Sequence, residues 1–147
     1  MTLKKNIIAL RQKKALVQMG GGKKAIEKQA AMGKMTARAR ILYLLDVNSF
    51  HEYELFVEHA ERNFGMDMKE LAGDGVITGT GTINGAPVCI YAQDFTVMGG
   101  SLGLKHARKI TKIMDHALKM KVPCIGINDS GGARIQEGIG ALAGYGE

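Results

Sequence analysis

The segment from residue 104 to residue 128 restricts the possible folds of this chain more than any other. LKHARKITKIMDHALKMK (104–121) repeats apolar side chains at steps of three and four, which predicts an amphipathic helix. Its buried stripe is Ala107, Ile110, Ile113, Met114, Ala117 and Leu118, and its outer side is Lys109, Lys112, Asp115, His116 and Lys119. VPCIGIN (122–128) is apolar almost throughout, as is typical of a buried strand in a parallel sheet.

Two β-rich segments precede that helix. VITGTGTI and APVCIYAQ flank Asn84-Gly85, the strongest short-range hairpin signal that a sequence carries. Gly79 and Gly81 alternate along the first segment, which indicates a crowded face, a solvent-open face or a bulge. The order strand, strand, helix, strand predicts an α/β fold whose last connection is a right-handed crossover. FHEYELFVEH (50–59) contains β-forming residues but has no clean period.

The first 49 residues indicate helices. Residues 3–18 and 23–32 have helical patterns separated by Gly20-Gly21-Gly22. Thr36 has the position of an N-cap for a third helix, whose buried stripe would be Ile41, Leu42, Leu44 and Leu45. We therefore expect a basic helical N-terminal arm at 1–49, followed by an α/β domain at 50–147.

The positive charge of the chain is concentrated in this arm. Residues 1–40 hold 11 Lys and Arg against a single acid, Glu27, so their net charge is +10, whereas the other 107 residues carry −4. This asymmetry suggests either a polyanionic partner or a solvated helix face. Nucleic acid is an unlikely partner on stacking grounds, because the first aromatic residue, Tyr43, lies beyond residue 40.

The cysteine pattern and the hydropathy indicate a cytoplasmic protein. Cys89 and Cys124 each lie in an apolar run without metal-type spacing, which predicts buried free thiols in a reducing compartment and no metal site. No apolar run approaches the ~18–20 residues that span a bilayer, so we expect no direct membrane insertion. No signal peptide is recognisable.

Two glycine turns follow two strands of the predicted sheet. MGGSLG (98–103) comes after the second hairpin strand, and DSGGAR (129–134) comes after the strand at 122–128. Each turn is expected to lead into a helix, the second one from about Ala133. The carboxyl ends of parallel strands meet at one edge of a sheet, where ligands usually bind. We therefore expect the two turns to lie side by side.

Three kinds of chemistry compete for the second turn. A nucleophilic Ser130 lacks the Gly-x-Ser-x-Gly pattern of a nucleophile elbow. A phosphate cradle of the common kinds is absent from both turns, although a helix N-terminus could still bind an anion. An oxyanion hole needs only backbone N–H groups and close approach, both of which glycine permits. The residues alone also allow simple tight turns.

The chain resembles a known enzyme family over nearly its whole length. GGGKKAIEKQAAMGKMTARARILYLLDVNSF, FVEHAERNFGM, GDGVITGTGTINGAPVCIYAQDFTVMGGSLG and INDSGGARIQEGIGALAGYGE carry the resemblance. The family is that of the carboxyltransferase β subunits of biotin-dependent acyl-CoA carboxylases, of the propionyl-CoA carboxylase β type. The chain is also similar to the α subunits of the sodium-pumping methylmalonyl-CoA and glutaconyl-CoA decarboxylases.

The resemblance implies a crotonase-like fold of ββα units and an acyl-CoA substrate. It implies that the N–H groups of Gly131, Gly132 and Ala133 stabilise a thioester enolate, with Gly99 and Gly100 on the neighbouring turn. It places the CoA phosphates near Lys34 and Arg38. The cofactor would be biotin, carried on a partner subunit or domain and not attached to this chain. The other partners would be biotin carboxylase and biotin carrier subunits and further copies of the chain.

The resemblance also sets limits. Family members are several times longer, so 50–147 would be the first part of the N-terminal crotonase-like domain, an incomplete domain. We accordingly expect the 147 residues alone to lack carboxyl transfer activity. Carboxylation and the reverse decarboxylation share the same half-reaction, and the residues here do not separate them. A crotonase-like hydratase or an acyl-CoA-binding domain without this activity is the alternative from another class. A hydratase needs paired carboxylates near the glycine turns, and Glu137 is the one candidate for that role close by.

Overall fold

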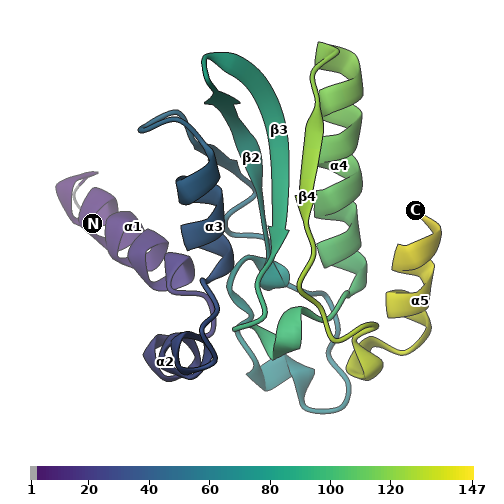
Figure 1. Cartoon of the computed structure of the whole chain (residues 1–147). Coiled ribbons are helices and arrows are strands. Elements are labelled where there is room, and N and C mark those ends of the chain that lie inside the picture. Colours follow the sequence, from purple (N-terminus) through teal and green to yellow (C-terminus); the bar gives the residue numbers. More distant parts are fainter. Residues whose placement is uncertain (1–2) are drawn as a thin grey trace.

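The structure is a computed structural model, and it describes residues 3–147. Its helices are α1 (Leu3–Gln18), α2 (Lys23–Ala31), α3 (Ala37–Leu44), α4 (Leu104–Met120) and α5 (Ile139–Gly146). Its strands are β1 (His51–Tyr53), β2 (Val76–Ile83), β3 (Ala86–Gln93) and β4 (Cys124–Ile127), in one sheet of order β1-β2-β3-β4. The predicted α/β fold with N-terminal helices is therefore confirmed, and β2, β3 and α4 follow one another as a ββα unit (Figure 1).

The hairpin forms as its sequence predicts. β2 and β3 pair antiparallel without interruption from Val76↔Gln93 to Ile83↔Ala86, so there is no bulge. Asn84 and Gly85 both have positive φ, 51° and 79°, as a type I′ turn requires. The glycines of β2 mark a crowded face, because a Cβ on Gly81 would collide with the Leu45 side chain.

Helices cover the two faces of the sheet. On one face Ile41 and Leu45 of the α3 region pack against Ile77 and Ile90. On the other face Ile113 and Ala117 of α4 pack against Cys89. The predicted cap of α3 is confirmed, since the Ala39 N–H donates to Thr36 Oγ1. The α3 region thus packs against the sheet of the α/β domain. The division into an arm at 1–49 and a domain at 50–147 stays a prediction.

The buried stripe predicted for the third helix is wrong in two positions. Leu42 and Leu44 are exposed, whereas Ala37, Ile41 and Leu45 are buried. These three residues are spaced by four, so they lie on one narrow side of a short helix, and that side alone meets the sheet.

The prediction for α4 contains errors of both kinds. Met114 and Leu118, which the pattern places in the buried stripe, are exposed, and Lys109, which it places on the outer side, is only 2% exposed. The Lys109 Nζ donates to the carbonyl oxygens of Gly73 and Val76, at 2.7 and 2.5 Å. The Gly73 oxygen also accepts from the Val76 N–H, so Lys109 adds a second donor there. Hydrogen bonds to these two carbonyl groups compensate for the burial of the ammonium group. Burial lowers the pKa of Lys109 to about 8.

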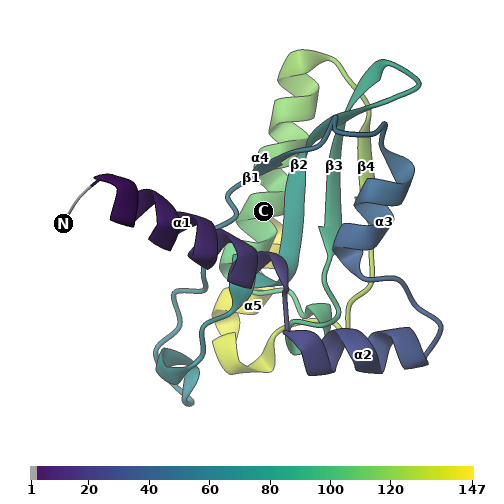
Figure 2. The ribbon, with the colours of Figure 1, turned by 90° about the vertical axis from the view of Figure 1, so that its left-hand side faces the viewer.

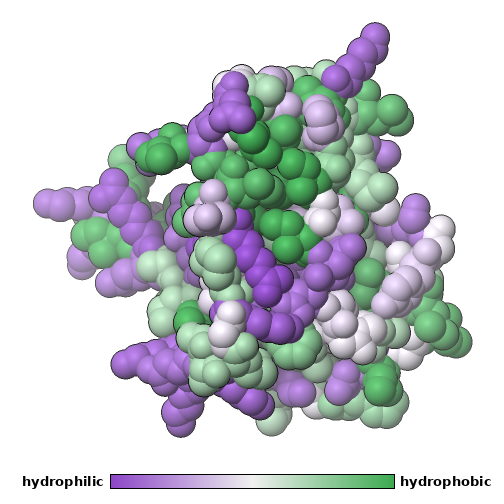
Figure 3. All heavy atoms as spheres, in the orientation of Figure 1, coloured by the Kyte–Doolittle hydropathy of each residue, from purple (hydrophilic) through white to green (hydrophobic). Residues whose placement is uncertain are grey.

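β4 pairs parallel to β3, as predicted, and in the observed register Cys124 lies opposite Cys89. It is less buried than expected, since Cys89 is buried but Cys124 is exposed. Among residues 3–147 β4 has a hydrogen-bonded neighbour on one side only, so one edge of the strand is open. Figure 3 shows hydrophobic side chains gathered on the face of the sheet between α3 and β4, where Ile125 and Ile127 are only partly buried.

The chain after β4 differs from the prediction. No α-helix begins near Ala133. Residues Ile135–Glu137 form a single 3₁₀ turn, and α5 starts at Ile139. Gly138, with φ of 51°, separates the two because this left-handed conformation cannot continue a helix.

The N-terminal helices lie to one side of the sheet. Figures 1 and 2 show α1 projecting away from the body of the molecule, and none of its residues is buried. Within the described part of the chain, no helix has the length and hydrophobicity needed to cross a membrane.

Candidate functional site

The two glycine turns form one hydrogen-bonded unit. The Gly131 N–H donates to the Gly99 carbonyl oxygen at 2.9 Å. Further along both turns, the Leu102 N–H donates to the Gly132 oxygen at 2.8 Å, and the Arg134 N–H donates to the Leu102 oxygen at 2.9 Å. The last two bonds make a parallel bridge between Leu102 and Ala133. The expectation that the turns meet at the sheet edge is confirmed.

These bonds determine which backbone N–H groups remain for a ligand. The Gly131 N–H is used by Gly99, and the Gly132 N–H donates to Ser130 Oγ at 3.1 Å. The peptide group between Gly132 and Ala133 is trans, so its N–H points opposite to its C=O, which Leu102 holds. The Ala133 N–H is therefore turned away from Leu102, and no group within residues 3–147 accepts from it.

Three glycines of the turns have conformations that other residues rarely adopt. Gly99, Gly100 and Gly132 have φ of 64°, 63° and 108°. A Cβ on Gly100 would collide with the Asp129 backbone, so only glycine allows the two turns to approach this closely. A Cβ on Gly132 would meet no atom within 4 Å. Gly132 therefore faces open space.

A buried ionic network lies behind the turns. Arg134 is fully buried, and its Nη1 pairs with Asp74 Oδ1 and, at 2.8 Å, with Glu137 Oε1. Its Nη2 donates to the Ser101 carbonyl oxygen at 2.9 Å. Glu137 Oε2 accepts from the Leu104 N–H at 2.8 Å, so this carboxylate caps α4 and does not serve the helix that follows it. The network joins both turns to the loop that contains Asp74.

His106 is buried beside this network and is neutral. Burial lowers the pKa of His106 to about 3. Its Nδ1 lies 2.8 Å from the Asp74 carbonyl oxygen and its Nε2 lies 3.2 Å from Gln93 Nε2. A neutral ring satisfies both partners if Nδ1–H donates to Asp74 and Nε2 accepts from Gln93. His106 therefore has neither a free nitrogen nor solvent access for proton transfer.

The predicted basic residues differ in their surroundings. Lys34 is partly exposed, pairs with Asp129 Oδ1 at 3.2 Å and lies 5.2 Å from the centre of the Phe95 ring. Arg38 makes two hydrogen bonds to the Glu52 carboxylate, at 2.7 and 2.8 Å, so both ends of its guanidinium are engaged. Arg40 Nη2 pairs with Asp129 Oδ2 at 2.9 Å. Two cations, Lys34 and Arg40, thus hold the carboxylate of Asp129, the first residue of the second turn.

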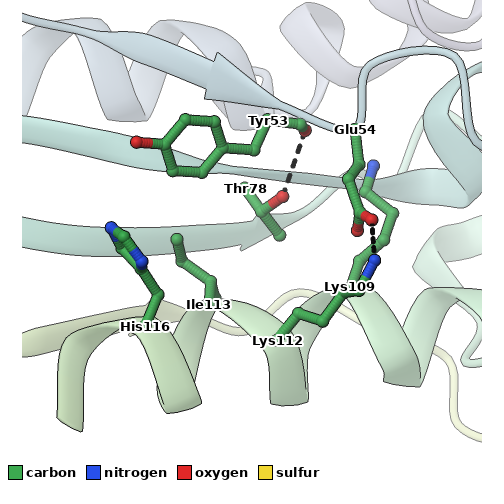
Figure 4. Close-up of a pocket in the computed structure, with 7 residues that line it drawn as sticks. All are labelled: Tyr53, Glu54, Thr78, Lys109, Lys112, Ile113 and His116. Atoms are coloured by element: carbon green, nitrogen blue, oxygen red, sulfur yellow. Dashed lines mark hydrogen bonds and ion pairs between the residues drawn. The ribbon is translucent and has the colours of Figure 1, made fainter. Parts of the chain in front are cut away.

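Cavities occur on both sides of α4. One of about 490 Å³ borders Ser130 and Gly132 and extends along Ile110 and Met114. Another, of about 330 Å³, lies between β1, β2 and α4, and Figure 4 shows Lys112 and Glu54 paired across its rim. None of the residues that line the second cavity belongs to a glycine turn. The cavity beside Gly132 is therefore the one adjacent to the candidate site.

Sequence reasoning missed most of the charged residues that shape the site. Arg134 lies just after the glycine pair, between Ala133 and Ile135, and its sequence position alone does not show that its side chain is buried. Asp74 lies between two glycines in GDG and adopts φ of 54°, a conformation for which aspartate is enriched. The Asp74 partner could not be assigned from the sequence, because Arg134 and Asp74 are 60 residues apart.

The sequence of the chain is similar to a protein family and to subunits of two enzymes. Residues 28–147 match the model of a family described as "Carboxyl transferase domain". The α subunit of methylmalonyl-CoA decarboxylase from Veillonella parvula is 58% identical over 146 residues, which covers 99% of this chain and 29% of that protein. The propionyl-CoA carboxylase β chain of Roseobacter denitrificans is 54% identical over 138 residues, which covers 94% of this chain and 27% of that protein.

A solved structure agrees with these matches. The crystal structure of transcarboxylase 12S, described as a hexamer with methylmalonyl-coenzyme A and methylmalonic acid bound, superposes with a TM-score of 0.97 at 46% identity. The match covers 99% of this chain and 29% of that chain. The chain thus spans less than a third of the length of these relatives.

Proposed function

Since the chain belongs to the carboxyl transferase domain family, we propose that it forms the acyl-CoA side of a biotin-dependent carboxyltransferase. The substrate class is a short acyl-CoA, with propionyl-CoA as the acceptor and methylmalonyl-CoA as its carboxylated form. The observation that supports this most directly is the Ala133 N–H. It has no acceptor among the described residues, and the Leu102 bridge sets its direction. The preceding residue, Gly132, lines the cavity of about 490 Å³.

In this proposal the Ala133 N–H donates to the thioester carbonyl oxygen. Negative charge develops on that oxygen when the α-carbon loses a proton, and a fixed donor stabilises the resulting enolate. The Gly132 N–H can join it, because its present acceptor is only the Ser130 hydroxyl, at 3.1 Å. Gly131, Gly99 and Gly100 act differently, since their contacts hold the two turns together and so set the direction of the donors.

The residues around the turns fit a reaction whose base comes from a cofactor. Asp129 is paired with Lys34 and Arg40, Glu137 caps α4 and pairs with Arg134, and His106 is buried. None of these groups is placed to take a proton from a ligand at Ala133. Carboxybiotin on a partner would supply both the carboxyl group and the base. This chain would contribute position and oxyanion stabilisation.

The CoA moiety would lie near the basic residues of the N-terminal segment. We assign the phosphates to the neighbourhood of Lys34, which is partly exposed and close to the second turn. Arg38 was also predicted to contact them, but its bidentate pairing with Glu52 leaves it less available. We propose that Arg38 supports this region by joining α3 to β1.

Decarboxylation is a second candidate, because a methylmalonyl-CoA decarboxylase α subunit is slightly more similar to the chain than a propionyl-CoA carboxylase β chain, at 58% against 54% identity. The names of both relatives refer to the same pair of acyl groups, propionyl and its carboxylated form methylmalonyl. The Ala133 N–H can stabilise the enolate in carboxylation and in decarboxylation alike. The partner subunits would distinguish the two functions. Copurification with a biotin carboxylase would favour carboxylation, and copurification with a membrane subunit would favour decarboxylation.

Oligomerisation with further copies is also proposed. Transcarboxylase 12S is described as a hexamer. In this chain α1 carries exposed apolar side chains, including Leu3, Leu10 and Leu16. Together with the hydrophobic area between α3 and β4, they provide surfaces suited to association.

The test is carboxyl transfer by the native full-length subunit. Incubated with methylmalonyl-CoA and free biotin, it should form propionyl-CoA, detected by mass spectrometry, and the reaction should require biotin. A biotin-independent hydration of an enoyl-CoA, with no carboxyl transfer, would instead identify a hydratase. Binding of CoA thioesters without any turnover would identify an acyl-CoA-binding domain.

A further inference from the structure

Two peptide groups connect the Arg134 guanidinium to the Ala133 N–H. Arg134 Nη2 donates to the Ser101 carbonyl oxygen at 2.9 Å. The same peptide group ends in the Leu102 N–H, which donates to the Gly132 oxygen at 2.8 Å. The peptide group of Gly132 in turn ends in the Ala133 N–H. Because both peptide bonds are trans, each N–H points away from the C=O of its own group.

We propose that this chain of bonds makes Arg134 a positioning residue for the oxyanion donor. The inference rests on the proposed function, in which Ala133 donates to a thioester oxygen. Arg134 would not touch the substrate. It would act through Ser101–Leu102 and Gly132–Ala133, whose dipoles are aligned head to tail between the guanidinium and the ligand.

The physical effect is polarisation as well as geometry. A cation that bonds to a carbonyl oxygen draws electron density toward it, which makes the N–H of the same peptide group a stronger donor. In series, hydrogen bonds strengthen one another by about 10–30% per bond. Burial increases this effect, because Arg134 has no solvent exposure that would screen its charge.

The surroundings of Arg134 keep it in place. Asp74 and Glu137 both pair with Nη1, and Nη2 also lies 3.2 Å from the Asp74 carbonyl oxygen. The guanidinium therefore has partners at several fixed positions. A lysine would keep the charge, but its single ammonium could not reach Asp74, Glu137 and Ser101 with this planar geometry.

The test measures the donor directly in the native full-length subunit. The probe is propionyl-CoA isotopically labelled at its carbonyl carbon, and the readout is the infrared stretch of the bound thioester carbonyl. Wild-type protein should lower this frequency relative to water. Replacement of the Ala133 amide by an ester, which removes the N–H, should abolish the shift and so tests the proposed function.

Two variants test the role of Arg134. Arg134→Lys, and an ester in place of the Leu102 amide, should each lose about half or more of the shift and reduce carboxyl transfer by roughly tenfold to a hundredfold. The affinity for free CoA, which lacks the carbonyl group, should change by less than about threefold. Arg108→Lys, on the exposed side of α4, is the matched control and should behave as wild type.

The outcomes separate the two ideas. If wild-type protein shows no shift, the oxyanion donor and the proposed function fail together. If the Ala133 ester loses the shift while Arg134→Lys and the Leu102 ester keep it, the proposed function stands and the role of Arg134 is wrong. If Arg134→Lys does not fold, the Leu102 ester alone decides, because it leaves the ionic network intact.

Discussion

Gly131 donates its N–H to the carbonyl oxygen of Gly99 at 2.9 Å, and this bond joins two turns that follow different strands of the sheet. Leu102 and Ala133 continue the contact as a parallel bridge. The candidate site is consequently a rigid backbone structure and not a cluster of reactive side chains. Its properties should respond more to changes in backbone conformation than to the removal of hydroxyl groups.

Gly100→Ala should destabilise the protein more than Gly99→Ala. Both glycines have φ near 64°, so alanine costs about 1–2 kcal/mol at either position. At Gly100 the new Cβ also collides with the Asp129 backbone, whereas at Gly99 the nearest atom, in the Phe95 ring, is 3.9 Å away. Urea denaturation of both variants measures the difference, which we expect to be about 1–3 kcal/mol. Equal stabilities would show that the turns can separate without cost.

Ser130→Ala should keep carboxyl transfer within about tenfold of wild type, because it removes a hydroxyl that accepts from the Gly132 N–H and no nucleophile. Gly132→Val should reduce the rate by on the order of 10²–10³, since φ of 108° excludes a β-branched residue and the side chain would occupy the space above the turn. Steady-state kinetics of the full-length subunit tests the order. An acyl-enzyme adduct on Ser130, trapped for mass spectrometry, would contradict the proposed mechanism.

Lys34→Ala should weaken binding of free CoA and reduce its dependence on salt, because Lys34 is the partly exposed cation beside the turn. Arg38→Ala should mainly lower the free energy of unfolding, since it leaves the half-buried Glu52 carboxylate without its bidentate partner. Titration calorimetry at two ionic strengths and urea denaturation distinguish the effects. Unchanged CoA affinity in Lys34→Ala would show that this basic segment is only a solvated surface.

The protein should lose stability in acid through His106. The folded pKa is about 3 and the ordinary value is 6.5, so protons bind the unfolded chain first as the pH falls. The contribution is complete above pH 6.5 and is lost toward pH 3, at up to about 1.4 kcal/mol per pH unit. Asp74 acts in the opposite sense, because burial raises the pKa of its carboxyl. Comparing wild type with His106→Gln cancels this background.

Urea denaturation between pH 7 and pH 4 provides the measurement for His106. The slope of the unfolding free energy against pH should be smaller in His106→Gln than in wild type, because glutamine offers a donor and an acceptor but does not titrate. His51→Gln, at an exposed site, is the control. A wild-type slope in His106→Gln would mean that the pKa of His106 does not differ between the folded and the unfolded protein.

Much of the fold follows from local patterns. The amphipathic helix α4, the hairpin at Asn84-Gly85 and the Thr36 cap all depend on neighbours within a few residues, so their signals can be read along the chain. The burial of Lys109 and the exposure of Leu42 were predicted wrongly for a physical reason. Which side of a helix is covered depends on the partners that a sheet presents, and at α4 two carbonyl groups accept hydrogen bonds from the buried lysine.

That two glycine turns meet at one edge of the sheet could be predicted from the sequence alone, because parallel strands place their carboxyl ends together. The family resemblance implied Gly131, Gly132 and Ala133 only as a group of donors. The tertiary structure shows which of these N–H groups have acceptors, since Gly99 accepts from Gly131 and Ser130 accepts from Gly132. It also decided that Arg134 pairs with Asp74, because an ion pair between residues distant in sequence forms only where the folded backbone brings two buried charges together.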